Sequence, residues 1–260
     1  MSSYNLRGKR EVEKDELMAR LADLAQGKDT PESWQQWWDE HKEQTASLLS
    51  PGEFLQLRPR QHGFKWVPLL AGQKVAVAIL QSAGISVEAS PVYHERYLEE
   101  LDNFSREQKR LQKEKQSTFK TNFPQLCTRY PRFCRALAKV LEVTDEIRMP
   151  AAPELITEQE HLLEFTFPDA VREFFTLTAG IRLSAGITVD LSSTFILEMD
   201  AHRYCVLGEY FKEADGDLLL LTAGEQTILY YAHERNQVTK LCNDMNELLE
   251  LKLSRYLNSQ

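Results

Sequence analysis

Apolar residues recur at helical spacing through the first half of the chain. Leu17, Leu21 and Leu24 stand at i, i+4 and i+7 in "EVEKDELMARLADLAQG", which predicts a helix with one apolar stripe. Next, "DTPESWQQWWDEH" places Thr30 where a side chain caps a helix and Pro31 at the first helical position. These patterns predict a mostly helical N-terminal region.

Three tryptophans share one face of that second helix. Trp34, Trp37 and Trp38 fall at i, i+3 and i+4, and His41 continues the row at i+7. Such a row suits either a ligand platform or a helix that docks into the core. We favour the core interpretation, because amphipathic helices ordinarily bury their apolar face.

The pattern changes at a proline-containing stretch. "IRMPAAPELITEQE" carries Pro150 and Pro153, and we predict a domain boundary there, with regions 1–150 and 151–260. Two helical segments follow it, then the short apolar runs "YCVLGEYF", "DLLLLT", "TILYYAH" and "QVTKLC", and a last helix in "NDMNELLELKLSRYL". The predicted fold class is therefore α+β, with a mainly antiparallel sheet flanked by helices in the second region.

Charge differs between the two regions. Residues 1–150 hold 23 Lys+Arg and 21 Asp+Glu, whereas residues 151–260 hold 8 and 18. The acidic second region disfavours nucleic acid as a partner, because phosphate binding draws on Lys and Arg, and favours a protein with a basic surface. The sequence has neither a long uncharged apolar run nor a signal-peptide pattern, so we expect a cytoplasmic protein without a membrane partner.

The "EADGD" stretch raises the question of metal or acid-base chemistry. It holds Glu213, Asp215 and Asp217, but a calcium loop of the EF-hand type beginning at Phe211 would have phenylalanine at position 1 and Thr222 at position 12. Asp-Gly between two strand-like runs instead favours a turn. We predict a turn that feeds the leucine strand and leaves its carboxylates on the surface.

The histidines and cysteines add no recognisable chemistry. The six histidines form neither HxxxH nor HExxH, and the four cysteines form no CxxC pair, a pattern typical of reduced thiols. We therefore predict no catalytic residues, no metal site and no cofactor. An enzyme whose catalytic residues are dispersed along the chain remains an alternative interpretation.

The second region follows a known order of segments. "FPDAVREFFTLTAG", "LGEYFKEADGDLLLLTAGEQTILYYAHE", a further strand and a final helix together resemble the SUKH superfamily, the Smi and Knr type domain, over roughly residues 155–257. Ala179 departs from the asparagine that is common in the family. The matching positions are Phe167, Pro168, Val171, Arg172, Phe174, Gly180, Gly216, Asp217, Tyr230, Tyr231 and His233.

The resemblance implies a noncatalytic immunity protein that binds a cognate secreted bacterial toxin and covers its active surface. It also allows an intracellular regulatory or scaffold protein that uses the same domain to bind an endogenous protein. In the first case, acidic groups would meet a basic cleft and aromatic residues would anchor the interface. The predicted partner-binding residues are Glu209, Glu213, Asp215, Asp217, Tyr231 and His233.

Overall fold

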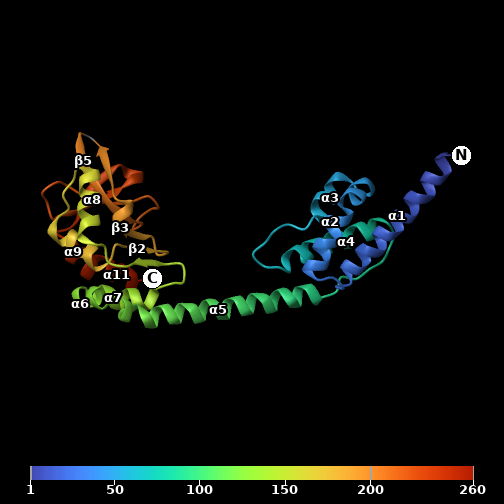
Figure 1. Ribbon diagram of the computed structural model, residues 1–260, viewed down its shortest axis with the longest axis horizontal. Coiled ribbons are helices and arrows are strands. Elements are labelled where there is room, and N and C mark those ends of the chain that lie inside the picture. The colour runs from blue at the N-terminus through green and yellow to red at the C-terminus, as the bar shows by residue number, and fades with distance from the viewer. Residues whose placement is uncertain (1, 200, 260) are drawn as a thin grey trace. The chain divides into compact units, whose positions relative to one another are not determined.

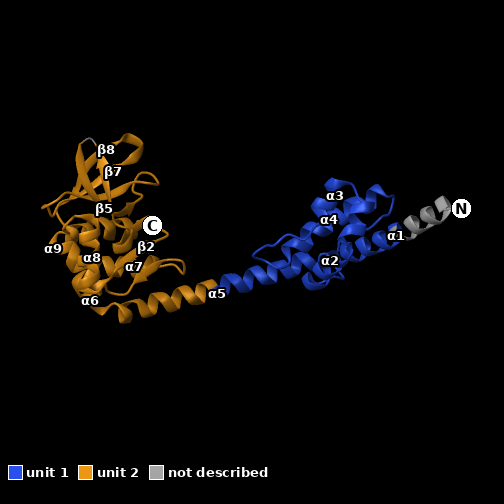
Figure 2. Ribbon diagram, turned by 45° about the horizontal axis from the view of Figure 1, so that its top comes forward, with its two compact units in different colours: residues 1–107 blue, residues 108–260 orange. Residues whose placement is uncertain are grey.

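The chain forms two compact units, residues 1–107 and 108–260 (Figure 2). A computed structural model describes residues 2–199 and 201–259, with side chains from residue 14 onward. The division falls inside a single helix, α5 (Val92–Asn122), and not at residue 150, where the sequence predicts a boundary. Residues 108–150 belong to the second unit because their apolar side chains share its core.

Unit 1 is helical throughout its regular segments (Figure 1). Its second helix begins as the sequence predicts, with Pro31 in its first turn and the Thr30 hydroxyl accepting the Ser33 backbone N–H at 3.1 Å. The helices of this unit are α1 (Ser2–Ala25), α2 (Pro31–Leu48), α3 (Pro51–Leu57), α4 (Val67–Ser82) and the first part of α5.

The tryptophan face of α2 enters the core of unit 1. Trp34 and Trp38 are buried, and the half-buried Trp37 stacks on Trp34 with ring centroids 5.0 Å apart. They pack in one cluster with Leu17, Leu21 and related side chains of α1 and α4. The core interpretation of this row is therefore confirmed.

Unit 2 combines helices with an eight-stranded antiparallel sheet, which confirms the predicted α+β class. The strand order is β1-β2-β3-β5-β6-β7-β8, and β4 also pairs with β5. The strands are β1 (Glu146–Arg148), β2 (Gly180–Leu183), β3 (Ile187–Asp190), β4 (Phe195–Met199), β5 (His202–Tyr210), β6 (Leu218–Leu221), β7 (Ile228–Ala232) and β8 (Gln237–Cys242).

Helices cover one face of this sheet. Their apolar side chains, among them Phe133, Phe174 and Leu249, form the large core together with the side chains that one face of the sheet contributes. In Figure 1, α6 and α7 lie along the lower side of unit 2, and β5 lies toward its upper side. The helical segments are α6 (Pro124–Arg129), α7 (Pro131–Val140), α8 (Pro153–Leu163), α9 (Asp169–Leu177), η1 (Leu191–Ser193), η2 (His233–Arg235), α10 (Met245–Glu247), η3 (Leu248–Leu253) and α11 (Ser254–Asn258).

None of the helices in the described part of the chain has the length and apolar character needed to cross a bilayer.

Candidate partner-binding face

The sheet of unit 2 has a second face, which we call the outer face. Residues directly opposite each other in antiparallel strands point to the same side, so the register identifies a row that crosses six strands. Alternate residues along those strands face the helices instead, as Ile181 and Leu219 do. The row on the outer face is Arg182, Thr188, Glu209, Leu218, Tyr231 and Val238.

One half of the outer face is apolar. Tyr204, Val206 and Leu220 are buried there although every described side chain in their cluster comes from a strand. They are shielded by a shell of partly exposed neighbours, and none of the described side chains in this cluster belongs to a helix. The shell consists of Leu197, Met199, Leu218, Leu229, Tyr231 and Val238.

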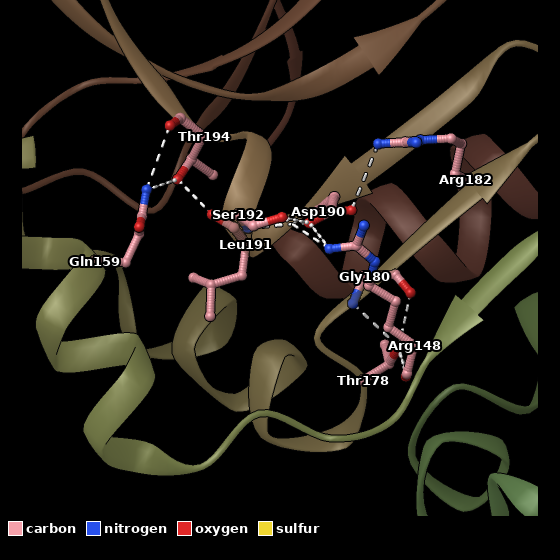
Figure 3. A network of polar contacts seen from close by, with 9 residues as sticks. All are labelled: Arg148, Gln159, Thr178, Gly180, Arg182, Asp190, Leu191, Ser192 and Thr194. Carbon is pink, nitrogen blue, oxygen red and sulfur yellow. Dashed lines mark hydrogen bonds and ion pairs between the residues drawn. The ribbon is translucent and has the colours of Figure 1, made fainter.

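The other half of the outer face is polar and centres on Asp190 at the end of β3 (Figure 3). Asp190 is 1% exposed, and its Oδ1 accepts Arg148 Nη1 at 3.0 Å. The same oxygen accepts the backbone N–H and the hydroxyl of Ser192 at 3.0 and 2.8 Å. Arg182 Nη2 is more distant, 3.8 Å from Oδ2. The buried carboxylate therefore has the partners that a buried charge requires.

Further hydrogen bonds connect this polar half to neighbouring segments of unit 2. The Thr178 hydroxyl donates to the Arg148 backbone carbonyl at 2.7 Å, which ties the end of β1 to the segment that precedes β2 (Figure 3). Gln159 of α8 donates to the Thr194 hydroxyl at 3.0 Å, just before β4. These contacts fix the positions of three strand ends, so we interpret the Asp190 network as support for the outer face.

We expect Arg148→Ala to destabilise unit 2 by about 1–2 kcal/mol, because it removes a charged hydrogen bond from a buried carboxylate. Arg182→Ala is the matched control and should cost less than about 0.5 kcal/mol, since that arginine is half-exposed and its ion pair is long. Urea unfolding monitored by thiol labelling reports the stability of unit 2 alone, because all four cysteines lie within it. If Arg148→Ala and Arg182→Ala lost equal free energy of unfolding, the hydrogen bond from Arg148 to Asp190 would not be an important support of the outer face.

The predicted site residues meet at one end of the outer face, but they differ in accessibility. Glu209 and Tyr231 lie in the cross-strand row, both half-buried. Glu213 and Asp215 are exposed on the loop between β5 and β6, and Glu213 forms an ion pair with Arg235 of η2. The side chain of His233 is 40% exposed. Five of the six predicted residues are thus at least partly accessible.

Asp217 is the exception, and the prediction that its carboxylate lies on the surface is wrong. The residue is 1% exposed. Its Oδ2 accepts the Ala214 backbone N–H at 3.1 Å and also accepts the Tyr230 hydroxyl. Its Oδ1 accepts the His233 backbone N–H at 3.0 Å. The His233 ring Nδ1 lies 3.2 Å from the same Oδ1. The carboxylate is buried because these partners replace water.

The same contacts set the ionisation of Asp217 and Tyr230. Burial raises the pKa of the Asp217 carboxyl, but the hydrogen bonds from Tyr230, His233 and Ala214 outweigh it and hold that pKa at about 2. Burial, and then the hydrogen bond to Asp217, raise the pKa of the Tyr230 hydroxyl. Asp217 is therefore a permanent anion near neutral pH, which locks the β5–β6 loop to β7 and η2.

Sequence reasoning missed the apolar shell of the outer face. The signal was present in "DLLLLT" and "TILYYAH", where both alternating sets of side chains are apolar. A strand with only one buried face would alternate apolar and polar residues. Continuous apolar runs in an antiparallel sheet indicate that both faces carry apolar surface, and here only one of them is covered by helices.

Among the residues that the structure describes, no group of three or more His, Cys, Asp and Glu side chains could hold a metal ion. Comparisons of the chain with family models, with curated proteins and with solved structures gave no match.

Proposed function

We propose that this chain is a noncatalytic binding protein, and specifically an immunity protein that neutralises a cognate secreted toxin by covering its active surface. The outer face of unit 2 is the contact surface in this proposal. An intracellular regulatory or scaffold protein that uses the same face is the second candidate, since the SUKH-like order of segments allows both.

The apolar cluster on the outer face is the observation that carries the proposal. Stable protein interfaces have an apolar centre, enriched in aromatic residues and surrounded by a polar rim. The outer face has this composition, with Tyr204 and Tyr231 among its apolar side chains and Glu209 directly opposite Leu218 of the shell. A partly exposed apolar sheet face of this kind typically marks a surface that another protein covers.

Charge at one end of this face favours a basic partner. Four accessible acidic residues gather there among the described residues, against Lys212 and Arg235, and the buried Asp217 adds a fifth negative charge from beneath the surface. Unit 2 as a whole is less acidic than residues 151–260, because residues 108–150 bring 10 Lys+Arg and 4 Asp+Glu to it. The excess of negative charge at this end of the outer face, and not the net charge of unit 2, is therefore what would steer a partner. The acidic residues are Glu209, Glu213, Asp215, Asp217 and Glu234.

The double substitution Leu229→Lys and Tyr231→Lys tests the face. We expect it to weaken partner binding by about 100-fold or more, as the loss of two central contacts at an interface does. Leu155→Lys with Leu162→Lys is the matched control, because both leucines are exposed on α8, and it should leave affinity unchanged. Capture with tagged wild-type protein supplies the partner, and calorimetry with the purified pair gives the affinities.

The identity of the captured partner separates the two candidates. An immunity protein should capture the toxic domain of a secreted protein, abolish its activity at one-to-one stoichiometry and protect cells that express it. A resident protein whose activity is unchanged by binding would support the scaffold. A partner that binds the outer-face variant as tightly as the wild type would overturn the choice of surface.

A further inference from the structure

Unit 1 contains a pocket that the proposed function does not use. It has a volume of about 690 Å³ and lies between the end of α3, the loop 58–66, the N-terminal half of α4 and Tyr97 of α5. Its apolar lining includes Val67, Leu70 and Val75. The volume falls within the range of about 300–1,000 Å³ that small-molecule sites occupy.

The loop wall of the pocket is held in place by specific contacts. The Glu100 carboxylate accepts the backbone N–H groups of Lys65 at 3.0 Å and Trp66 at 3.3 Å. The Phe64 ring makes edge contacts with Tyr97 and Phe104, with centroids 5.7 and 5.5 Å apart. The loop is thus anchored to α5 by both polar and aromatic contacts, and the pocket it borders is preformed.

Positive charge lines the pocket without a counter-charge. Arg58, Arg60 and Lys74 are exposed and lie along it, and none of them has an ion pair or a side-chain hydrogen bond with the described residues. His62 also lines it, and its Nδ1 accepts the Phe64 backbone N–H at 3.0 Å, which leaves Nε2–H as a donor. No described lining residue is Asp or Glu. The lining therefore attracts anions.

We infer that this pocket binds a small amphiphilic organic anion, with a phosphate, sulfonate or carboxylate head and an apolar or aromatic body. The arginine and lysine side chains supply charged donors for the head, and arginine in particular matches the geometry of phosphate and carboxylate oxygens. The apolar lining and the Tyr97 ring receive the body. Neither an apolar molecule alone nor an inorganic anion alone satisfies both parts of the pocket.

A matched set of probes tests this inference with the full chain. We expect 1-naphthyl phosphate to bind at one saturable site by calorimetry, and 1-naphthol and inorganic phosphate each to bind at least 10-fold more weakly. Amide resonances of α4 should shift on titration in NMR spectra. If dodecanoate displaces 1-naphthyl phosphate, the natural ligand belongs to the lipid-like carboxylates. If dodecanoate does not displace it, the natural ligand belongs to the compact aromatic anions.

Two pairs of variants locate the site. Ala71 is an exposed pocket residue, so Ala71→Trp should fill the pocket and reduce naphthyl phosphate affinity more than 10-fold, whereas Ala78→Trp, exposed on the same helix outside the pocket, should not. Arg58→Gln with Lys74→Gln should have a similar effect, and Lys14→Gln with Lys42→Gln should have none. Unchanged binding in Ala71→Trp, or no saturable binding by the wild type, would overturn the inference. Either result leaves the proposal for unit 2 intact, because every variant lies in unit 1.

Discussion

Replacing Gly208 with alanine is expected to destabilise unit 2 by about 4 kcal/mol or more, in the range of the most damaging single substitutions. A Cβ at this position would lie 1.8 Å from the Thr188 carbonyl oxygen and 3.0 Å from Val189 Cα. Both atoms belong to the backbone of β3, which pairs with β5 in the register Val189 to Gly208. A backbone neighbour in a ladder cannot move aside as a side chain can, so the pairing itself would have to break.

The cysteines allow this loss to be measured in unit 2 alone. Cys134, Cys205 and Cys242 are buried, and burial raises the pKa of the Cys205 and Cys242 thiols to about 12, so these groups should react only after unfolding. All four tryptophans lie in unit 1, so their fluorescence serves as an internal reference. When thiol labelling is used to monitor urea unfolding, the midpoint for unit 2 should move to a much lower urea concentration in Gly208→Ala than in the wild type.

Gly224→Ala provides the control for the Gly208 variant. Gly224 also has glycine-specific geometry, with φ of +77°, but open space surrounds its missing Cβ. Gly224→Ala should lower the free energy of unfolding of unit 2 by only about 1 kcal/mol, which is the strain of an L-residue in a left-handed conformation. If the Gly208 and Gly224 variants lost similar stability, close packing of β3 on β5 would not be the reason that Gly208 is required.

Local signals in the sequence predicted much of the helical structure. Pro31 stands in the first turn of α2 as predicted, and the tryptophan stripe that follows it faces the core, as Trp34 does. These features depend on residues within one or two turns of each other. They are the part of a fold that a single sequence can specify.

The boundary between the units could not be predicted in the same way. Pro150 and Pro153 mark a connection inside unit 2, where the Ala151 N–H donates to the Phe175 carbonyl at 3.0 Å and the Ala179 N–H to that of Met149 at 2.9 Å. The actual division lies within the charged helix α5, and helical spacing continues through it. Which part of a long helix joins which core depends on contacts distant in sequence.

The candidate site shows the same limit. The Asp-Gly turn before the leucine strand is confirmed, with Gly216 at φ of +94° and β6 beginning at Leu218. The burial of Asp217 was missed because its partners Tyr230 and His233 follow β6 and come from the next strand and its end. Turn chemistry is local, whereas the environment of a carboxylate is set by what the sheet brings beside it.

The buried carboxylate links stability to the geometry of the proposed interface. Asp217 holds the loop that carries Glu213 and Asp215 against the segment that carries His233. These residues form the acidic end of the outer face. Loss of the carboxylate should therefore loosen this end as well as destabilise unit 2.

We expect Asp217→Asn to cost about 3 kcal/mol near pH 6, because the amide NH2 would face hydrogen-bond donors that the carboxylate now accepts. Asp215→Asn, on the same loop but exposed, is the control and should cost less than about 0.5 kcal/mol. The measurement is urea unfolding followed by circular dichroism, with tryptophan fluorescence identifying the transition of unit 1. If Asp217→Asn lost no more stability than Asp215→Asn, the carboxylate of Asp217 would not be what holds the β5–β6 loop in place.

The pH dependence of this cost identifies its electrostatic part. The folded pKa of Asp217, about 2, lies below the value of about 3.9 expected in the unfolded chain, so the unfolded state takes up the proton first on acidification. The stabilisation is therefore complete above about pH 5 and is lost as the pH falls toward 2, by about 2 kcal/mol. Asparagine does not titrate, so the difference between wild type and Asp217→Asn should shrink by that amount between pH 6 and pH 2. A difference that stays constant over this range would mean that the carboxylate acts through its shape and not through its charge.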